Sequence, residues 1–211
     1  MHILTVYRTF QQKFRPRRMR RFVELFGVRD TSRIVDVGGT ADNWSYISQK
    51  PRLTIVNLEK MATDCDNIAY AAGDARALTY QDKAFEIAYS NSVIEHVGTW
   101  EDQIRFAAEI RRVGQGYYVQ TPYRWFPIEP HFVAPFIHWL PKSIQRHLTW
   151  AGAWYWTVKP DRKGIDSYID EIELLDVRQM KTLFPDAEIM RERFLGMTKS
   201  LIAVKRPAAI G

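Results

Sequence analysis

Apolar residues recur at helical spacing over the first 26 residues of the chain. The stripe consists of Ile3, Tyr7, Phe10, Phe14, Met19, Phe22, Val23 and Phe26. This spacing predicts a helix over residues 3–26. We expect Pro16 to kink this helix or to begin a second one, because proline lacks the backbone N–H and its ring clashes with the preceding turn.

From Arg33 onward, short apolar runs alternate with polar stretches of helical length, a pattern typical of βαβ units. The apolar runs predict strands at residues 33–37, 53–58, 68–72, 85–90 and 116–121. Helices are predicted at residues 42–49, 76–80 (short), 100–113 and 174–184. Two further strands are predicted at residues 186–194 and 198–205, joined as an antiparallel hairpin through Leu195, Gly196 and Met197. The fold class is therefore α/β, a Rossmann-like doubly wound sheet that is mostly parallel and ends in a hairpin.

Residues 123–156 interrupt this alternation. They hold 10 of the chain's 28 aromatic residues together with several prolines. A segment this apolar does not behave as a disordered linker, so we predict a cap of short helices. Its aromatic side chains would form either an acceptor pocket or a small core of their own. Nine of the ten are the candidates for this role: Trp125, Phe126, Phe132, Phe136, Trp139, Trp150, Trp154, Tyr155 and Trp156.

The composition is that of an ordinary globular protein, with 46% hydrophobic and 26% charged residues in a chain of 211. No run approaches the roughly 20 apolar residues of a membrane span, and no signal peptide is recognisable. Cys65 is the only cysteine, which excludes an intramolecular disulfide and suits a reducing compartment. We expect a cytoplasmic protein, or one peripheral to the inner face of the membrane.

The net charge of +6 is concentrated at the N-terminus. Residues 1–24 hold seven basic side chains and one acidic, while the remainder holds 23 of each. Three interpretations of this arm remain open. It covers the ligand site with its basic face in solvent, it contacts anionic lipid or an anionic acceptor through residues 1–26, or it binds nucleic acid. The last is not expected, because no separate nucleic-acid module is visible.

Polar residues and glycines follow four of the predicted strands in turn. They are Asp36, Gly38, Gly39 and Thr40, then Asn57, Leu58 and Glu59, then Gly73, Asp74 and Ala75, and finally Ser90, Asn91 and Ser92. Ligands of open α/β sheets bind at the carboxyl ends of the strands. There Glu59 could accept both ribose hydroxyls of an adenosyl group, and Asp74 could accept from an adenine amino group. A dinucleotide is not favoured, because the Gly-x-Gly-x-x-Gly phosphate loop is absent and Asp42 would repel a phosphate.

This order of strand ends resembles that of class I S-adenosylmethionine-dependent methyltransferases of the type 11 group, and is distantly similar to ubiquinone-pathway O-methyltransferases. The resemblance covers residues 33–121 and extends to the hairpin at 186–205. It implies S-adenosyl-L-methionine as cofactor and S-adenosyl-L-homocysteine as product. The family loop is usually Asp-x-Gly-x-Gly-x-Gly, and here Thr40 and Asp42 replace the second and third glycines. We expect Thr40 to bind the methionine carboxylate and Asp42 or Asn43 to cap the following helix.

The resemblance divides the single domain, residues 1–211, into four parts. These are a basic helical arm (1–27), a cofactor-binding half (28–122), an aromatic cap insertion (123–165) and a C-terminal helix and hairpin (166–206). The implied function is methyl transfer, with a hydroxyl of a small molecule or a glycan- or lipid-linked compound as acceptor. The alternative is a non-catalytic S-adenosylmethionine-binding module that engages a partner or a membrane through the arm. The oligomeric state is left open.

Transfer to a hydroxyl is helped by a base that removes its proton. The candidate catalytic residues are Glu95 and His96, after the fourth strand, and His131 in the insertion. Alternatively, Glu95 and His96 cap a helix and line the pocket without taking part in chemistry. Some similar O-methyltransferases bind a metal through Glu-x-x-Glu-His. Here Ser92 stands in place of the first glutamate. His131 could complete a site, and two imidazoles with one carboxylate would favour a transition metal over magnesium. No metal is expected.

Overall fold

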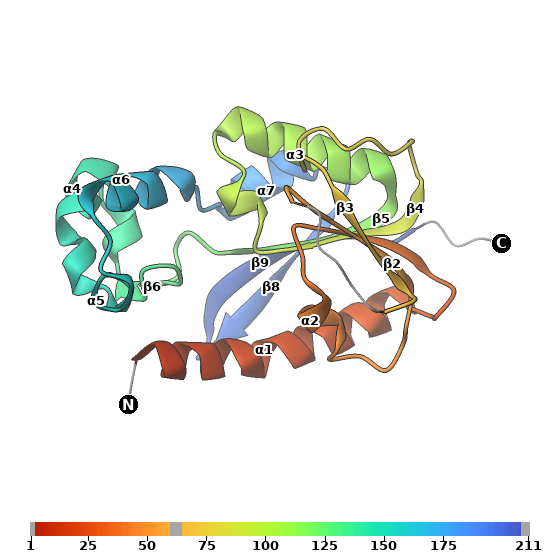
Figure 1. Cartoon of the computed structure of the whole chain (residues 1–211), viewed down its shortest axis with the longest axis horizontal. Helices are drawn as coiled ribbons and strands as arrows, with labels where there is room; N and C mark the ends of the chain where they lie inside the picture. The colour runs from red at the N-terminus through yellow and green to blue at the C-terminus, as the bar shows by residue number, and fades with distance from the viewer. Residues whose placement is uncertain (1–2, 60–64, 208–211) are drawn as a thin grey trace.

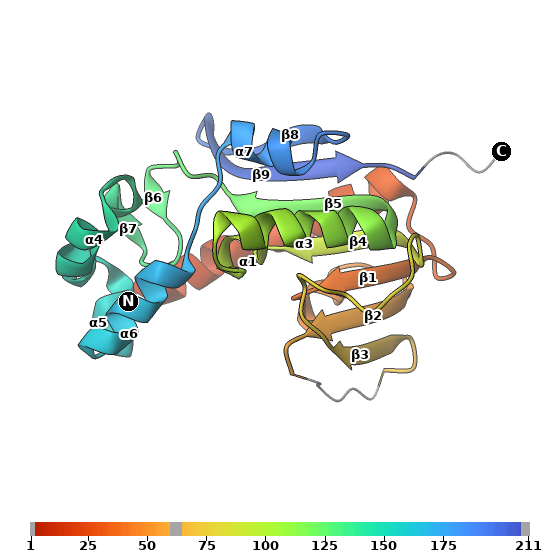
Figure 2. The ribbon, with the colours of Figure 1, turned by 90° about the horizontal axis from the view of Figure 1, so that it is seen from above.

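The computed structural model describes residues 3–59 and 65–207, with side chains from residue 14 onward. Seven strands form one sheet in the order β3-β2-β1-β4-β5-β9-β8 (Figure 2). They are β1 (Arg33–Val37), β2 (Arg52–Asn57), β3 (Ile68–Ala72), β4 (Phe85–Asn91), β5 (Gly114–Pro122), β8 (Glu188–Phe194) and β9 (Met197–Lys205). The strands β1 to β5 are parallel, and β9 pairs antiparallel with both β5 and β8. The predicted mostly parallel sheet and its C-terminal hairpin are confirmed.

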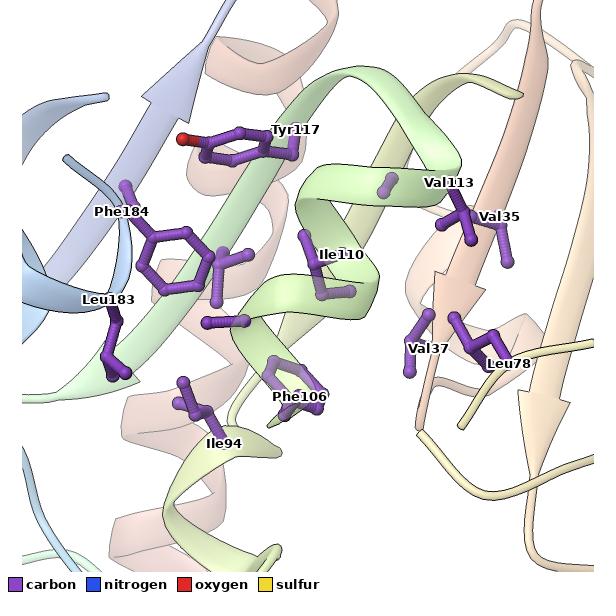
Figure 3. Packing of buried hydrophobic residues seen from close by; sticks show 14 of the residues in the cluster. Val35, Val37, Leu78, Ile94, Phe106, Ile110, Val113, Tyr117, Leu183 and Phe184 are labelled. Carbon is purple, nitrogen blue, oxygen red and sulfur yellow. The ribbon is translucent and has the colours of Figure 1, made fainter. Parts of the chain in front are cut away.

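Helix α3 (Trp100–Val113) covers one face of the sheet, as its sequence predicts. Thr99 and Asp102 form a reciprocal capping box at its start, which satisfies backbone N–H groups that the first turn leaves free. Its apolar stripe, which includes Phe106 and Ile110, packs against β1 and β5 (Figure 3). Helix α7 (Val177–Leu183) extends the same layer.

Helix α1 (Ile3–Phe26) covers the opposite face of the sheet (Figure 1). Its range matches the prediction, and Met19 and Phe22 are fully buried in the core on that face. Pro16 lies inside this one helix, so the prediction that it begins a second helix is wrong. Proline at that position removes only one backbone hydrogen bond, and the burial of the turn that follows outweighs this cost.

Three of the predicted helices are shorter or absent. The helix predicted at 174–184 is α7, which begins at Val177 after its cap Asp176 and ends at Leu183. In place of 42–49, α2 (Ala41–Trp44) ends where the indole of Trp44 donates a hydrogen bond to Asp36. The predicted helix at 76–80 is a turn. The Arg76 side chain folds back onto Asp74, and the N–H of Leu78 donates to the carboxylate of Glu109. At 42–49 and at 76–80, contacts to the sheet or to α3 replace further helical turns.

The insertion contains short helices, as predicted, at one end of the sheet (Figure 1). Its elements are β6 (Ile128–Glu129), β7 (Ala134–Pro135), the 3₁₀ helices η2 (Ile137–Trp139) and η3 (Thr149–Ala151), and α4 (Lys142–Leu148), α5 (Ala153–Val158) and α6 (Arg162–Glu171). It has a core of its own, formed by Phe132, Ala134, Ile137, Ile169, Ile172 and Leu174. Helix α6 runs through residue 165, where the sequence analysis ends the insertion, because Asp161 caps it earlier.

Among the described residues, no helix combines the length and the apolar character that crossing a bilayer requires.

Candidate functional site

The turn after β1 brings its backbone close to a buried carboxylate. Asp36 is fully buried, and its Oδ2 accepts a hydrogen bond of 2.7 Å from the Trp44 indole. Its Oδ1 has no hydrogen-bond partner among the described residues. Burial raises the pKa of Asp36 to about 7. A Cβ on Gly39 would lie 2.0 Å from this carboxylate, so only glycine fits there.

Hydrogen bonds link the carboxyl ends of β1 and β2. Gly38, with φ of 77°, donates from its N–H to Val56, and Asn57 Nδ2 donates to the carbonyl of Gly39. Leu58 is 80% exposed at this edge, an unusual position for a large apolar side chain. Glu59 is exposed beside it, next to residues 60–64, which lie outside the described part of the chain.

The carboxylate of Asp74 is already engaged within the chain. It accepts hydrogen bonds from Nε and Nη2 of Arg76, at 2.7 to 3.1 Å, and Arg76 also donates to Asp102. The Arg76 hydrogen bonds lower the pKa of Asp74. The backbone N–H of Arg76 also donates to Oδ1, so Arg76 makes four contacts with a carboxylate that has about four acceptor sites. Gly73 and Ala75 flank it at intermediate exposure.

A residue that is not among the predicted site residues donates hydrogen bonds at the end of β4. Arg18 of α1 is 8% exposed and donates to Asn91 Oδ1 at 2.5 Å and to Gln120 Oε1 at 2.9 Å. It also forms a bidentate ion pair with Glu192 of β8. The expectation that the whole basic face of the arm lies in solvent is therefore wrong for Arg18. Its position four residues after Phe14 and four before Phe22, on the apolar stripe, is the signal that would have indicated burial.

Two serines complete the end of β4. Ser90 is buried and donates to the carbonyl of Val37, and Ser92 donates to Gln120 at 3.0 Å. Ser92 has φ of 57°, which turns the chain sharply after the strand. Thr40 is the N-cap residue of α2, but its side chain makes no capping hydrogen bond.

The expectation that Asp42 or Asn43 caps the helix after β1 is wrong. Both residues lie inside α2, and Asn43 donates instead to the hydroxyl of Tyr89. The side chain of Asn43 is therefore committed to the core rather than to the start of the helix.

Glu95, His96 and His131 come together although they lie far apart in the sequence. The first two belong to the 3₁₀ helix η1 (Ile94–His96), directly after β4, and His131 lies between β6 and β7. One nitrogen or oxygen atom from each lies within 4.8 Å of those of the other two. The imidazole rings meet edge to face, with centroids 4.7 Å apart. Thr99, and neither Glu95 nor His96, is the N-cap of α3.

Glu95 is fully buried. Its Oε2 accepts a hydrogen bond of 3.0 Å from Thr121, while Oε1 has no hydrogen-bond partner in the part of the chain that the structure describes. Burial raises the pKa of Glu95, and the positive charges of His131 and His96 only partly offset this effect. A buried acceptor without a donor costs free energy, so Oε1 is an atom to which a ligand could bind.

Each imidazole of this cluster has a carboxylate beside it. His131 Nδ1 lies 2.6 Å from Oε1 of the fully buried Glu129, whose other oxygen accepts from a backbone N–H. His96 Nδ1 lies 3.2 Å from Glu171 Oε1, at ion-pair distance but without hydrogen-bond alignment. Burial lowers the pKa of His131, but the hydrogen bond and charge of Glu129, together with the other carboxylates, outweigh it and raise the pKa.

The aromatic residues of the insertion divide between two roles. Phe132 and Trp154 belong to its core, as in the interpretation of a small separate core. Trp125 and Phe136 are each 51% exposed and Trp139 is 41% exposed, and they form a contiguous group with ring centroids 4.9 and 6.1 Å apart. The guanidinium of Arg124 lies 5.6 Å from the Trp125 ring. A surface suited to an amphipathic ligand therefore remains beside the core.

Residues 40–116 match a family model described as a methyltransferase domain. Two uncharacterized proteins from strains of Mycobacterium tuberculosis are 34% identical over 68 residues, which are 31% of this chain. This chain spans about a quarter of their length, since the match covers 23% of each.

Solved structures of methyltransferases share the fold. A Methanosarcina mazei S-adenosylmethionine-dependent methyltransferase is 12% identical, with a TM-score of 0.51 over 86% of this chain and 95% of its own. A Haloferax volcanii methyltransferase, solved with the activator Trm112, is 13% identical, with a TM-score of 0.55 over 90% and 87%. A Haemonchus contortus phosphoethanolamine N-methyltransferase, solved with S-adenosylmethionine, is 14% identical, with a TM-score of 0.52 over 80% and 37%.

The cofactor of this class of domain is S-adenosylmethionine. Residues 40–116 therefore match a methyltransferase domain, and the chain shares its fold with S-adenosylmethionine-dependent methyltransferases.

Proposed function

We propose that the chain transfers the methyl group of S-adenosylmethionine to a hydroxyl of a small molecule or of a glycan- or lipid-linked acceptor. The carbon–sulfur bond of the sulfonium breaks, a carbon–oxygen bond forms, and S-adenosylhomocysteine leaves. The hydroxyl loses its proton to the protein or to solvent. The observation that carries the proposal is the meeting of four strand ends with the cluster of Glu95, His96 and His131 at one edge of the sheet.

The strand ends fit the cofactor. Glycine at positions 38 and 39 keeps the backbone accessible, since a side chain at either would meet Val93 or Asp36. The apolar Leu58 and the acidic Glu59 are exposed together, which suits an adenosyl group with its ribose hydroxyls. No phosphate is required, and the acidic rim favours a sulfonium cation. The remaining cofactor residues are proposed as Thr40, Asn57, Gly73, Asp74, Ala75, Ser90, Asn91 and Ser92.

The side chains of Glu95, His96 and His131 are proposed to face the hydroxyl of the methyl acceptor. Val93, which touches the β1 turn at Gly38, immediately precedes Ile94 of η1, so the cluster adjoins the proposed cofactor site. When Nδ1–H of His131 donates to Glu129, Nε2 is the ring nitrogen that can accept from a hydroxyl. We propose Glu95, His96 and His131 as the residues that receive the acceptor oxygen and assist the loss of its proton.

The exposed aromatic group of Trp125, Phe136 and Trp139 favours a glycan or lipid portion on the acceptor. Aromatic faces pack against the apolar side of sugar rings and against alkyl chains, while the nearby Arg124 suits an anionic group. The alternative role as a non-catalytic binding module depends on the basic arm. It is not favoured by a specific observation, because Arg18 is buried and paired within the domain.

The test uses the full chain with methyl-labelled S-adenosylmethionine and a panel of hydroxyl acceptors that includes free sugars, glycolipids and phenols. We expect labelled product together with S-adenosylhomocysteine. Replacement H131A should lower kcat by about 100-fold, the usual contribution of a positioned acid–base group. Calorimetric affinity for S-adenosylmethionine should stay unchanged in H131A.

The exposed His147 provides a matched control, and H147A should keep the parental kcat. Failure of the chain to bind either cofactor form would contradict the proposal. Binding without turnover across the panel would instead favour the binding module.

A further inference from the structure

The cluster of Glu95, His96 and His131 has the composition of a site for a transition metal ion. Its three side chains offer two imidazole nitrogens and one carboxylate oxygen within 4.8 Å of one another. Zinc in catalytic sites is bound by three such protein ligands, with a fourth position left for water or substrate. Magnesium and calcium prefer oxygen ligands throughout, so the two imidazoles disfavour both ions.

The buried state of Glu95 gives independent support. Its side chain is fully buried, Thr121 occupies only Oε2, and Oε1 has no partner among the described residues. An ionised carboxylate in such a place is costly unless a cation or a donor neutralises it. A divalent cation between Glu95 and the two imidazoles would remove this cost.

The carboxylates around the cluster match the outer shell of a metal site. A histidine ligand commonly donates its other ring N–H to a carboxylate, which fixes the tautomer and the ring orientation. Glu129 holds Nδ1 of His131 at 2.6 Å and is itself fixed by a backbone N–H, leaving Nε2 for an ion. With the ion bound, Nε2 would be a ligand in place of a base, and the ion would assist loss of the hydroxyl proton by lowering the pKa of the oxygen it binds. Glu171 lies 3.2 Å from Nδ1 of His96. A divalent ion would also balance much of the negative charge of these glutamates.

We propose that Glu95, His96 and His131 bind one divalent transition metal ion, with zinc as the expected occupant and Glu129 as a positioning residue. Ligand atoms around tetrahedral zinc lie about 3.3 Å apart, given bonds of about 2.0 to 2.1 Å. The present separations of up to 4.8 Å would therefore contract by small side-chain rotations. With His96 27% and His131 14% exposed, solvent and an acceptor hydroxyl can reach the fourth position. This departs from the expectation that no metal binds and takes up the alternative in which His131 completes the site.

The inference does not depend on methyl transfer, because it can be tested without cofactor or acceptor. The full chain, freed of any affinity tag and stripped with a chelator, is titrated with Zn²⁺ in a calorimeter. Metal retained after gel filtration is then counted by mass spectrometry. We expect one zinc per chain. Titration with Co²⁺ should give the visible absorption of a low-symmetry, four-coordinate site, which a loose surface ion does not show.

Four variants make the test specific. E95Q and H131A should each lose the stoichiometric zinc and the cobalt spectrum. E129Q should retain both but bind roughly 10- to 100-fold more weakly, the usual effect of losing such a partner. H147A, at an exposed histidine outside the cluster, should bind as the parent does.

Circular dichroism establishes that each variant is folded before its metal content is compared. If E95Q does not fold, H131A carries the test, because its side chain is partly exposed. Substoichiometric zinc in the parent chain, or one zinc per chain in both E95Q and H131A, would overturn the proposal. Methyl transfer that fails while zinc binds as expected would count against the proposed function alone.

Discussion

The buried carboxylate of Asp36 makes the stability of the protein depend on pH in an unusual direction. Burial raises the pKa of Asp36 from about 3.8 to about 7, with the hydrogen bond from Trp44 opposing it. The folded protein therefore binds a proton more tightly than the unfolded chain. Protonation of Asp36 therefore contributes to the free energy of unfolding in full at low pH, and this contribution is lost as the pH rises from about 4 through 7. The neighbouring titratable group is Tyr89, whose pKa burial raises further, so it stays neutral over this range.

The size of the effect follows from the two pKa values. A carboxyl group with a pKa of about 3.8 in the unfolded chain and about 7 in the folded protein contributes to the free energy of unfolding. Between pH 5 and pH 8 this contribution falls by about 2.5 kcal/mol. Asparagine at position 36 has nearly the same shape, accepts from the Trp44 indole in the same way, and does not titrate. The substitution D36N should therefore leave stability similar at pH 4 and raise it relative to the parent at pH 8.

The assay is urea unfolding of the parent and D36N at pH 5, 6, 7 and 8, followed by circular dichroism. The difference in unfolding free energy between the two proteins should grow by about 2.5 kcal/mol over this range. Taking this difference cancels the titration of every other group. The control D66N, at an exposed carboxyl, should show no such growth. A difference between parent and D36N that does not change with pH would refute the reasoning.

Three further predictions concern the arm, the glycine turn and the insertion. R18M should cost about 3 kcal/mol in urea unfolding, because Glu192, which is 15% exposed, loses its 2.6 Å ion pair and keeps Lys199 at 3.8 Å. R18M/E192M should recover most of this, and R17M, at an exposed site, should change the unfolding free energy by less than about 0.5 kcal/mol. G39A should weaken calorimetric binding of S-adenosylmethionine at least tenfold, or about 1.4 kcal/mol, because the new Cβ meets a carboxylate at 2.0 Å. W125A should raise the KM for the acceptor while changing the unfolding free energy by less than about 0.5 kcal/mol, because the ring is 51% exposed; an unchanged KM would remove Trp125 from the acceptor surface.

The strands and the long helices could be predicted because their patterns are local. The strands Arg33–Val37 and Ile68–Ala72 and the helices Ile3–Phe26 and Trp100–Val113 have the predicted bounds. In each of these elements, burial of one face or of both faces requires apolar residues at regular spacing, and this spacing can be recognised in the sequence. The mostly parallel sheet with its C-terminal hairpin followed from the alternation of strands and helices along the chain.

The interactions that complete the site could not be predicted in this way. Arg18 looked like one more solvated cation of the arm, and its burial depends on Gln120 and Glu192, far along the chain. The turn at 76–80 depends on a side chain of α3 that occupies the N–H of Leu78. The pairing of His131 with Glu129 needed the geometry of the β6–β7 loop. Such contacts join distant segments, and a single sequence carries no periodic signal for them.

The end of β5 connects the arm with the proposed acceptor side. Successive residues of a strand point to opposite faces of the sheet. Gln120 accordingly faces α1, where it accepts from Arg18 and from Ser92, while Thr121 faces the other layer and donates to Glu95. The ion pair of the arm and the buried glutamate of the cluster are therefore attached to adjacent positions on one strand. Because close-packed interiors transmit strain between residues in contact, we expect a change at Arg18 to affect the cluster through this strand end. R18M should then lower zinc affinity as well as stability, whereas a loss of stability without any change in zinc affinity would show that the two faces are independent.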